Sequence, residues 1–188
     1  LSNMGIPFEQ RNFQKELDKK IAGFQKDGIV PTLLLHSCCA PCSSHCIEYL
    51  SDYFHITVFY YNPNISAEEE YRKRVEEQKR FISEFPAKYK VSFIEGDYDT
   101  KEFYDIAKGY EQCREGGERC FRCYELRLRK TCETAKAGGF DYFTTTLTIS
   151  PLKHSVRLNE IGLKLSEEYD MPYLCLLYTS PSPRDRTR

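Results

Sequence analysis

Short apolar segments alternate with longer amphipathic segments along most of the chain. Each short segment is rich in β-branched or aromatic residues and is bounded by turn-forming residues, which is typical of a buried strand. The pattern predicts strands at residues 32–36, 56–61, 91–95 and 141–146, and a fifth from residue 172. It predicts one helix that starts at residue 40 and three more at 68–85, 100–109 and 119–137. A loop is predicted at 147–152, and a last helix follows it to about residue 169.

Strands that alternate with helices through short turns favour a parallel sheet with helices on both faces. Right-handed crossovers between parallel strands produce this arrangement in nearly all cases. We therefore expect an α/β fold, a single three-layer domain with a mostly parallel sheet. Ligands bind such sheets at the carboxyl ends of the strands, so reactive residues just after a strand are candidates for a site.

The same pattern divides the chain into three regions. Residues 1–29 are polar with apolar residues at helical intervals, which predicts an N-terminal helical extension. Residues 30–175 carry the α/β pattern. Residues 176–188 lose periodicity and become rich in Ser, Pro and Arg, which predicts a non-native or disordered tail from read-through. The fold should continue there with a strand and a helix, so we expect the natural chain to be longer.

Composition excludes several classes of protein. The 188 residues include 27 basic and 28 acidic residues, and a net charge of −1 excludes a histone-like polycation. The nine cysteines are odd in number and fall below the roughly 8–10% of a disulfide scaffold. No apolar run is long enough for a membrane span and no secretory signal is evident, so we expect a cytoplasmic protein. In that reducing setting, paired cysteines are more often metal ligands or redox groups than disulfides.

Two cysteine pairs stand at predicted helix starts. Cys38 and Cys39 follow the first strand, where the helix N-terminus favours thiolate over thiol. Cys120 and Cys123 form a C-x-x-C on the first turn of a later helix, so both sulfurs point the same way. The two pairs can meet at one edge of the sheet, which predicts a metal or redox site. Cys42 is a further candidate.

The remaining cysteines and the spacing of the pairs leave the metal open. Buried apolar packing is expected for Cys46, Cys113 and Cys132. Zinc ribbons separate their pairs by about 15–20 residues, whereas Cys42 and Cys120 are 78 residues apart. Adjacent thiolates suit a cluster beside a further metal, or a cluster with an open coordination position.

Weaker signals each have an ordinary structural alternative. His36 ends a buried strand, where a packed histidine is favoured over a metal ligand. Asp97 and Asp99 follow another strand and are as readily turn residues as ligands. Ser150 and Lys153 lie beyond a strand end, where a phosphate contact and a solvated loop are equally expected.

The helix that carries the second cysteine pair is locally basic. Basic residues there exceed acidic ones by three, which favours thiolate and phosphate. They are Arg114, Arg119, Arg122, Arg127, Arg129 and Lys130, set against Glu115, Glu118 and Glu125. Neither G-x-x-x-x-G-K-[ST] nor G-x-G-x-x-G occurs, and the first strand–helix turn has no glycine, so ATP binding is disfavoured.

Six motifs, taken jointly, resemble those of the cobalamin-independent epoxyqueuosine reductases in order and spacing. They are LLLHSCCAPCS at 33–43, YYNPNI at 60–65, EYR at 70–72, EGDYD at 95–99, GGERCFRCYELRL at 116–128 and FTTTLTISP-x-K at 143–153. The resemblance spans residues 33–174. The sequence departs from the family at residues 176–188, where a basic segment and a Tyr-Cys-Gly-Cys-like end are expected.

The resemblance implies an oxidoreductase that reduces epoxyqueuosine to queuosine at the wobble position of tRNA. The implied fold is similar to PP-loop (HUP-like) α/β proteins, without their ATP-binding glycine loop. The implied cofactor is an iron–sulfur cluster, expected to be 4Fe–4S, and a further iron beside the cluster is a second option. No cobalamin, ATP or flavin site is recognised. The implied partners are tRNA carrying epoxyqueuosine and an external electron donor of the ferredoxin or flavodoxin type.

The resemblance also implies roles for individual residues. The implied metal ligands are Cys38, Cys39, Cys120 and Cys123. Cys38, Cys39 and Asp99 are the implied catalytic residues, and Asp97 or Asp99 is the implied oxygen ligand. The implied substrate-binding residues are Asn64, Arg127, Ser150 and Lys153, with Arg127 and Lys153 at anticodon-loop phosphates.

Two other functions remain open. Cys39-Ala-Pro-Cys42 has the C-x-P-C form of thiol–disulfide oxidoreductases, although that function leaves Cys120 and Cys123 without a role. A zinc-stabilised RNA-binding module would use the basic helix without any chemistry. The metal content of the purified protein distinguishes the three.

Overall fold

The computed structural model describes residues 12–149 and 154–176. In these ranges a four-stranded sheet alternates with helices along the chain, as the apolar pattern predicted. The strands are β1 (Thr32–His36), β2 (His55–Tyr60), β3 (Ser92–Glu95) and β4 (Tyr142–Thr145). The helices are α1 (Phe13–Asp27), α2 (Ala40–Leu50), α3 (Glu68–Glu84), α4 (Thr100–Ala107), α5 (Glu118–Ala137), the 3-10 helix η2 (Thr146–Ile149) and α6 (Ser155–Tyr169).

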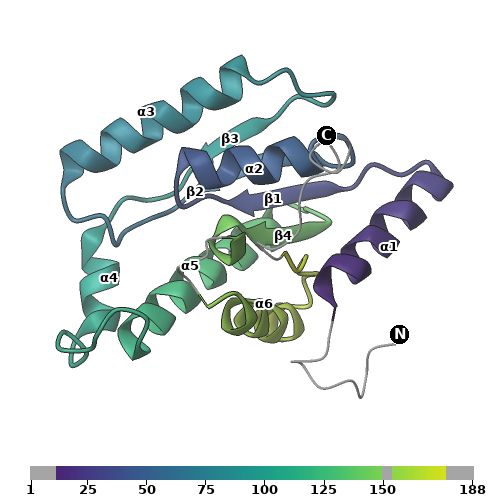
Figure 1. Cartoon of the computed structure of the whole chain (residues 1–188). Coiled ribbons are helices and arrows are strands. Elements are labelled where there is room, and N and C mark those ends of the chain that lie inside the picture. The colour runs from purple at the N-terminus through teal and green to yellow at the C-terminus, as the bar shows by residue number, and fades with distance from the viewer. Residues whose placement is uncertain (1–11, 150–153, 177–188) are drawn as a thin grey trace.

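All four strands are parallel, in the order β3-β2-β1-β4. Helices α2 and α3 lie on one side of the sheet and α5 and α6 on the other (Figure 1). The expected three-layer α/β fold is therefore confirmed. The chain runs outward from β1 through β2 to β3 and then returns to place β4 on the other side of β1. The carboxyl ends of β1 and β4 thus form a topological switch point, where sheets of this kind open a crevice for ligands.

Alternate residues of β1 supply two separate cores. Leu33 and Leu35 face the core that includes α2, whereas Leu34 faces the core that includes α5 and α6. Because successive side chains of a strand point to opposite faces, a continuous apolar run indicates a strand buried on both sides. Leu17 and Ile21 of α1 pack into the same core as Leu33, so one face of this helix belongs to the domain's core.

Two segments depart from the expected secondary structure. The fifth strand is reduced to one bridge, in which Phe143 donates to the carbonyl of Pro172 and accepts from Leu174, both over 3.0 Å. Pro172 has no N–H to extend the ladder, and the Tyr173 ring packs so closely on Gly162 that a Cβ there would come within 2.4 Å of it. The segment expected to be a loop from residue 147 begins as η2.

The first residue of the expected tail, Leu176, is packed against the rest of the domain. Leu176 is buried, and its carbonyl accepts a hydrogen bond from Asn159 over 3.1 Å. Residues 177–188 lie outside the described part of the chain, so the boundary at residue 175 stays a prediction.

Within residues 12–149 and 154–176, no helix combines the length and the apolar character that a membrane crossing requires.

Candidate metal centre at the end of strand β1

The candidate site begins where β1 gives way to α2. Ser37, Cys38 and Cys39 form the connection, and Cys39 is the N-cap of α2 with extended backbone angles of φ −166° and ψ 161°. Pro41 follows in the first turn, where its missing N–H is not needed. The sequence therefore places two thiols at the carboxyl edge of the sheet and beside a helix N-terminus, as expected.

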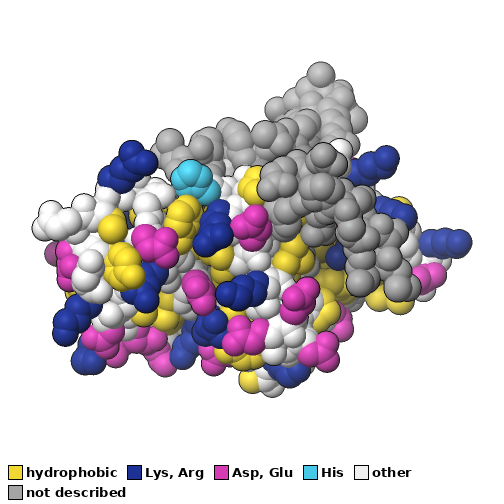
Figure 2. Space-filling view, turned by 90° about the horizontal axis from the view of Figure 1, so that it is seen from below, with side chains coloured by type: hydrophobic (Ala, Val, Ile, Leu, Met, Phe, Trp, Pro, Cys, Tyr) yellow, Lys and Arg dark blue, Asp and Glu magenta, His cyan; other side chains and the backbone are white. Residues whose placement is uncertain are grey.

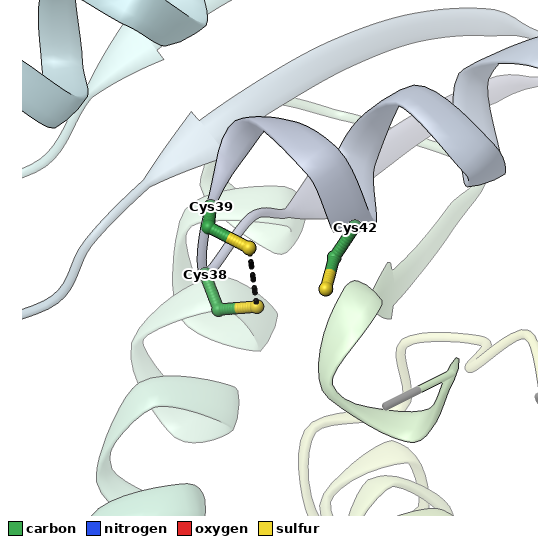
Figure 3. Close-up of side chains that lie close together, drawn as sticks. All are labelled: Cys38, Cys39 and Cys42. Atoms are coloured by element: carbon green, nitrogen blue, oxygen red, sulfur yellow. Dashed lines mark hydrogen bonds between the residues drawn. The ribbon is translucent and has the colours of Figure 1, made fainter. Parts of the chain in front are cut away.

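Three sulfurs lie close together at this point. The Sγ atoms of Cys38, Cys39 and Cys42 all lie within 4.8 Å of one another, and those of Cys38 and Cys39 are 3.8 Å apart (Figure 3). Of the three, Cys42 comes from the first turn of α2. It was a further candidate and not one of the four ligands that the resemblance implied. Its three-residue spacing from Cys39 was the signal for it, because such residues share a helix face.

The connection is held from one side by a glutamine of α3. The hydroxyls of Ser37 and Ser43 both donate to Oε1 of Gln78, over 2.6 and 3.0 Å. The amide of Asn62, just after β2, donates to the carbonyl of Ser37 over 2.9 Å. Gln78 and Asn62 are buried, so these bonds are shielded from water. Neither residue was predicted as part of the site, because nothing in the sequence marks which polar side chains lie under a loop.

Thr146 holds the connection from the other side. It is the residue that follows β4, and its hydroxyl accepts the backbone N–H of Cys38 over 3.1 Å and donates to the Cys38 sulfur over 3.3 Å. These two bonds span the topological switch point between β1 and β4. The sequence predicts residues 144–146 only as part of a strand. The position of Thr146 at the end of a strand was the available signal.

One thiol of the three is set to ionise. Hydrogen bonds from Cys39 and then Cys42 hold the pKa of Cys38 well below its usual value, with smaller contributions from the Thr146 hydroxyl and the Arg127 guanidinium. The hydrogen bond to Cys38 is the largest cause that raises the pKa of Cys42. It is also the largest cause that raises the pKa of Cys39. The hydrogen bonds among the three sulfurs therefore favour a thiolate at Cys38 over one at Cys39 or Cys42.

His36 is a packed histidine, as expected. Its Nε2 lies 2.9 Å from the carbonyl of Tyr61 and its Nδ1 lies 2.9 Å from the hydroxyl of Thr145. A carbonyl only accepts, so Nε2 carries the proton and Nδ1 accepts from Thr145. Burial, and then the charge of Arg127, lowers the pKa of His36 to about 4. A neutral ring with both nitrogens occupied is not free to bind a metal.

The second cysteine pair lies on the first turns of α5, which packs against β1. Cys120 accepts the backbone N–H of Gly116 at its sulfur over 3.3 Å, and Cys123 is buried. Cys120 and Cys38 pack against the same apolar cluster. Among the described residues, the set of mutually close sulfurs stops at the first three cysteines. A ligand role for Cys120 and Cys123 therefore stays a prediction.

The basic residues expected around α5 differ in their contacts. Arg129 forms ion pairs with Glu125 over 2.9 Å and with Glu168 over 2.8 Å. Figure 2 shows Lys and Arg side chains interspersed with Asp and Glu over the face that it displays. Arg127 is 4% exposed and donates to Oδ1 of Asn62 over 3.1 Å. Contact between Arg127 and a tRNA phosphate stays untested, but its burial favours an internal role.

Of the other expected site residues, Asn64 follows the carboxyl end of β2 and Asp99 that of β3. Asp99 is exposed and caps α4, where its side chain accepts the backbone N–H of Lys101 over 3.0 Å. Asn64 is partly buried, and its Oδ1 has no hydrogen-bond partner among the described residues. Ser150 and Lys153 lie outside the described residues.

The expectation for the remaining cysteines is met in two cases of three. Cys132 is fully buried and Cys46 is 3% exposed, as predicted for cysteines that act as apolar core residues. Burial raises the pKa of Cys132 to about 11, so it stays a neutral thiol. The predicted burial of Cys113 is wrong. Cys113 is partly exposed, because it lies in the turn between α4 and α5 and not in a core-facing element.

Comparison with known proteins connects this site to a family. A family model described as epoxyqueuosine reductase QueH matches residues 33–182. The chain is 39% identical to epoxyqueuosine reductase QueH of Streptococcus pyogenes over 93% of this chain and 69% of that protein. It is 42% identical to the Haemophilus influenzae protein of that name, over 73% and 55% of the two chains. The match to the Thermotoga maritima protein of that name is 34%, over 76% and 72%. The chain therefore belongs to the epoxyqueuosine reductase QueH family and is an oxidoreductase.

Proposed function

We propose that this protein reduces epoxyqueuosine to queuosine at the wobble position of tRNA, with an iron–sulfur centre held by its paired cysteines. The reaction consumes two electrons and two protons, and the epoxide oxygen leaves as water while an alkene forms. The observation that carries the proposal is the sulfur triad at the switch point of a QueH-family fold. Family membership supplies the reaction, and the triad supplies a place for the cofactor.

The donor set fits a thiolate-bound metal. Two sulfurs bound to one tetrahedral metal at about 2.3 Å lie about 3.8 Å apart, which matches the separation of the Cys38 and Cys39 sulfurs, 3.8 Å. Cys42 completes a set of three soft ligands, the kind that favours iron–sulfur centres over hard cations. The triad as it stands suits one metal ion, and the wider ligand set of a 4Fe–4S cluster would include Cys120 and Cys123. When bound, such a centre supplies single electrons and an iron that acts as a Lewis acid.

The surrounding residues act on the sulfurs and on the substrate. Thr146 and the α2 N-terminus stabilise negative charge on Cys38. The Oδ1 of Asn64 is buried and has no hydrogen-bond partner among the described residues, and it is proposed to accept a hydrogen bond from the target base. Asp99, at the N-terminus of α4, is proposed as the oxygen ligand of an additional iron. Ser150 and Lys153 are proposed to contact the anticodon loop.

The proposed partners follow from the chemistry. The substrate is tRNA whose target base is unstacked and inserted at the carboxyl edge of the sheet. The two electrons arrive singly from an external donor of the ferredoxin or flavodoxin type. A cytoplasmic location is proposed, because both partners are found there.

The test combines metal analysis with a nucleoside assay. The 188-residue chain, purified without oxygen, is analysed for iron, sulfide and zinc, and is incubated with dithionite and tRNA containing epoxyqueuosine. Mass spectrometry of the digested tRNA should show queuosine with the unsubstituted chain, none with Cys38→Ser, and queuosine with the matched control Cys132→Ser. An iron-containing chain that leaves epoxyqueuosine unchanged under these conditions contradicts the proposed reaction.

The same preparation distinguishes the two alternative functions. A colourless protein with one zinc per chain would support an RNA-binding module. A metal-free protein that reduces protein disulfides through Cys39 and Cys42 would support a thiol–disulfide oxidoreductase.

A further inference from the structure

Three of the six motifs take no part in the sulfur triad, and the structure brings them together in one aromatic cluster. The motifs are those at residues 60–65, 70–72 and 95–99. They lie on the connections that leave β2 and β3 at the carboxyl edge of the sheet, and on the first turns of α3 (Figure 1). The cluster holds the turn between β2 and α3 in place.

This turn is formed by Asn62, Pro63, Asn64 and Ile65. The N–H of Ile65 donates to the carbonyl of Asn62 over 3.2 Å, which closes a four-residue turn. Proline suits the second position of such a turn because its ring fixes φ, and asparagine suits the first. Asn64 takes the third position, so its orientation depends on how the two ends of the turn are held.

The first end is bound to the loop of the sulfur triad. Asn62 is buried, and its Nδ2 donates over 2.9 Å to the carbonyl of Ser37, the residue directly before Cys38. Arg127 donates to Oδ1 of the same side chain over 3.1 Å. Asn64 is therefore two residues from a direct contact with the connection that carries the thiols.

The second end is bound by Tyr98, which comes from the connection between β3 and α4. Its hydroxyl donates to the carbonyl of Ile65 over 2.5 Å. Its ring stacks on that of Tyr71 in α3, with centroids 3.8 Å apart and 9° between the planes. Tyr71 in turn donates to Glu95 over 3.2 Å, and Arg72 forms an ion pair with the same carboxylate over 2.9 Å. All three motifs thus converge on one end of the turn.

Asn64, between the two ends, has a buried acceptor that no described residue uses. Its Oδ1 has no hydrogen-bond partner in the part of the chain that the structure describes. A buried acceptor left unpaired is costly, so a native protein that keeps one needs a reason such as a binding role. The edges of an unstacked nucleobase carry N–H donors that an asparagine amide can pair with.

We propose that Tyr98 is the positioning residue that fixes Asn64 for contact with the target base, and that Tyr71 supports Tyr98 by stacking. Tyr98 acts through the turn and does not touch the substrate. This inference rests on the proposed function for the identity of the base. It rests on the described contacts alone for the coupling between Tyr98 and the turn.

The first test is a double-mutant cycle in substrate binding. Metal-loaded protein without reductant is titrated with a labelled anticodon stem-loop that contains epoxyqueuosine, and fluorescence anisotropy gives the Kd. Asn64→Ala should raise the Kd about two- to tenfold, which corresponds to the usual net contribution of one hydrogen bond. Tyr98→Phe keeps the stack but loses the bond to Ile65, and should raise the Kd by a smaller factor. The double variant should bind no more weakly than Asn64→Ala, because Tyr98 acts only through Asn64.

The matched control is Tyr49→Phe. It also removes a hydrogen bond of a tyrosine hydroxyl, to Asp18 over 2.8 Å, but at the end of α2 that lies away from the triad. It should leave the Kd unchanged. Under turnover, Tyr98→Phe should raise KM while kcat and iron content stay the same. A merely structural role for Tyr98 predicts additive losses in the cycle, or a fall in iron content and kcat at an unchanged Kd, and either outcome overturns the inference.

A second test needs neither metal nor RNA. Hydrogen exchange of the metal-free chain is read by mass spectrometry on peptides that cover residues 61–67. Exchange there should be faster in Tyr98→Phe than in the unsubstituted chain and unchanged in Tyr49→Phe. Equal exchange in the two variants overturns the inference. Binding that shows the expected coupling, in a protein that leaves epoxyqueuosine unchanged, contradicts the proposed reaction and supports the role of Tyr98.

Discussion

The hydroxyl of Thr146 binds Cys38 twice, accepting its backbone N–H over 3.1 Å and donating to its sulfur over 3.3 Å. One side chain from the end of β4 thus fixes both the backbone and the reactive atom of a residue at the end of β1. Such outer contacts orient metal ligands and tune their charge, and hydrogen bonds to sulfur are among the factors that set the potential of iron–sulfur centres.

Replacing Thr146 should therefore destabilise the protein even without a metal. Thr146→Val keeps the shape of the side chain but removes the hydroxyl, which leaves the Cys38 N–H without an acceptor. We expect a loss of about 1–3 kcal/mol in the free energy of unfolding, the usual cost of an unsatisfied buried donor. Urea unfolding of the metal-free chain measures it. Thr146→Ser retains the hydroxyl and should be clearly more stable than Thr146→Val; equal stability of the two would show that the hydrogen bonds contribute nothing.

Replacing Gln78 should disorder the cysteine loop. Gln78→Met is similar in size but cannot accept from the hydroxyls of Ser37 and Ser43. We expect both lower stability, by about 1–3 kcal/mol, and fewer iron atoms per chain after reconstitution, because the ligands are no longer held together. Gln14→Met is the control, since Gln14 makes its hydrogen bonds on α1 and Tyr49, away from the loop. Unchanged iron binding in Gln78→Met would contradict the positioning role of Gln78.

The cysteines should separate into ligands and core residues when iron is measured. Cys42→Ser should reduce the iron bound per chain, because its sulfur lies within 4.8 Å of the sulfurs of Cys38 and Cys39. Cys132→Ser should retain iron, since Cys132 is fully buried in the core between α5 and α6. Elemental analysis of anaerobically purified protein makes the comparison. Equal iron loss in both variants would indicate general destabilisation and not the loss of a ligand.

The ligand role of the second pair has its own test. Cys120→Ser and Cys123→Ser should each abolish retention of a multi-iron centre if the wider ligand set is correct. Sulfide and iron content, with the visible absorption near roughly 400 nm that is typical of iron–thiolate charge transfer, report the outcome. Full iron and sulfide content in both variants would restrict the centre to Cys38, Cys39 and Cys42.

Two glycine substitutions test the packing that replaces the expected fifth strand. Gly162→Ala should destabilise the protein by about 1–3 kcal/mol through overpacking, because its Cβ would lie 2.4 Å from the Tyr173 ring. Gly23→Ala is the control, since nothing lies within 4 Å of a Cβ at that position in α1. It should stabilise the protein by about 0.4–1 kcal/mol through helix propensity and lower unfolded-state entropy. Thermal unfolding of the two variants should therefore shift in opposite directions.

The secondary structure and the place of Cys38 and Cys39 were predictable because they depend on neighbours in the sequence. β1 occupies residues 32–36 as expected, and α5 differs from its predicted range by one residue. An apolar run bounded by turns favours a strand, and a small residue followed by proline favours the start of a helix; both signals are local. The alternation of these elements then indicated the parallel sheet and the edge at which both thiols would stand.

The tertiary structure alone decided how the loop is held and how it is charged. Thr146 is 108 residues from Cys38, Gln78 is 41 from Ser37, and Arg127 is 65 from Asn62. No local pattern specifies such pairs, because their proximity depends on the strand order β3-β2-β1-β4 and on how α3 and α5 cover the two faces of the sheet. The sequence by itself determined that thiols would stand at this edge. Only the packing of distant elements determined that Thr146 and Gln78 hold the loop of Cys38, and that Arg127, one of several basic residues predicted on its helix, is buried.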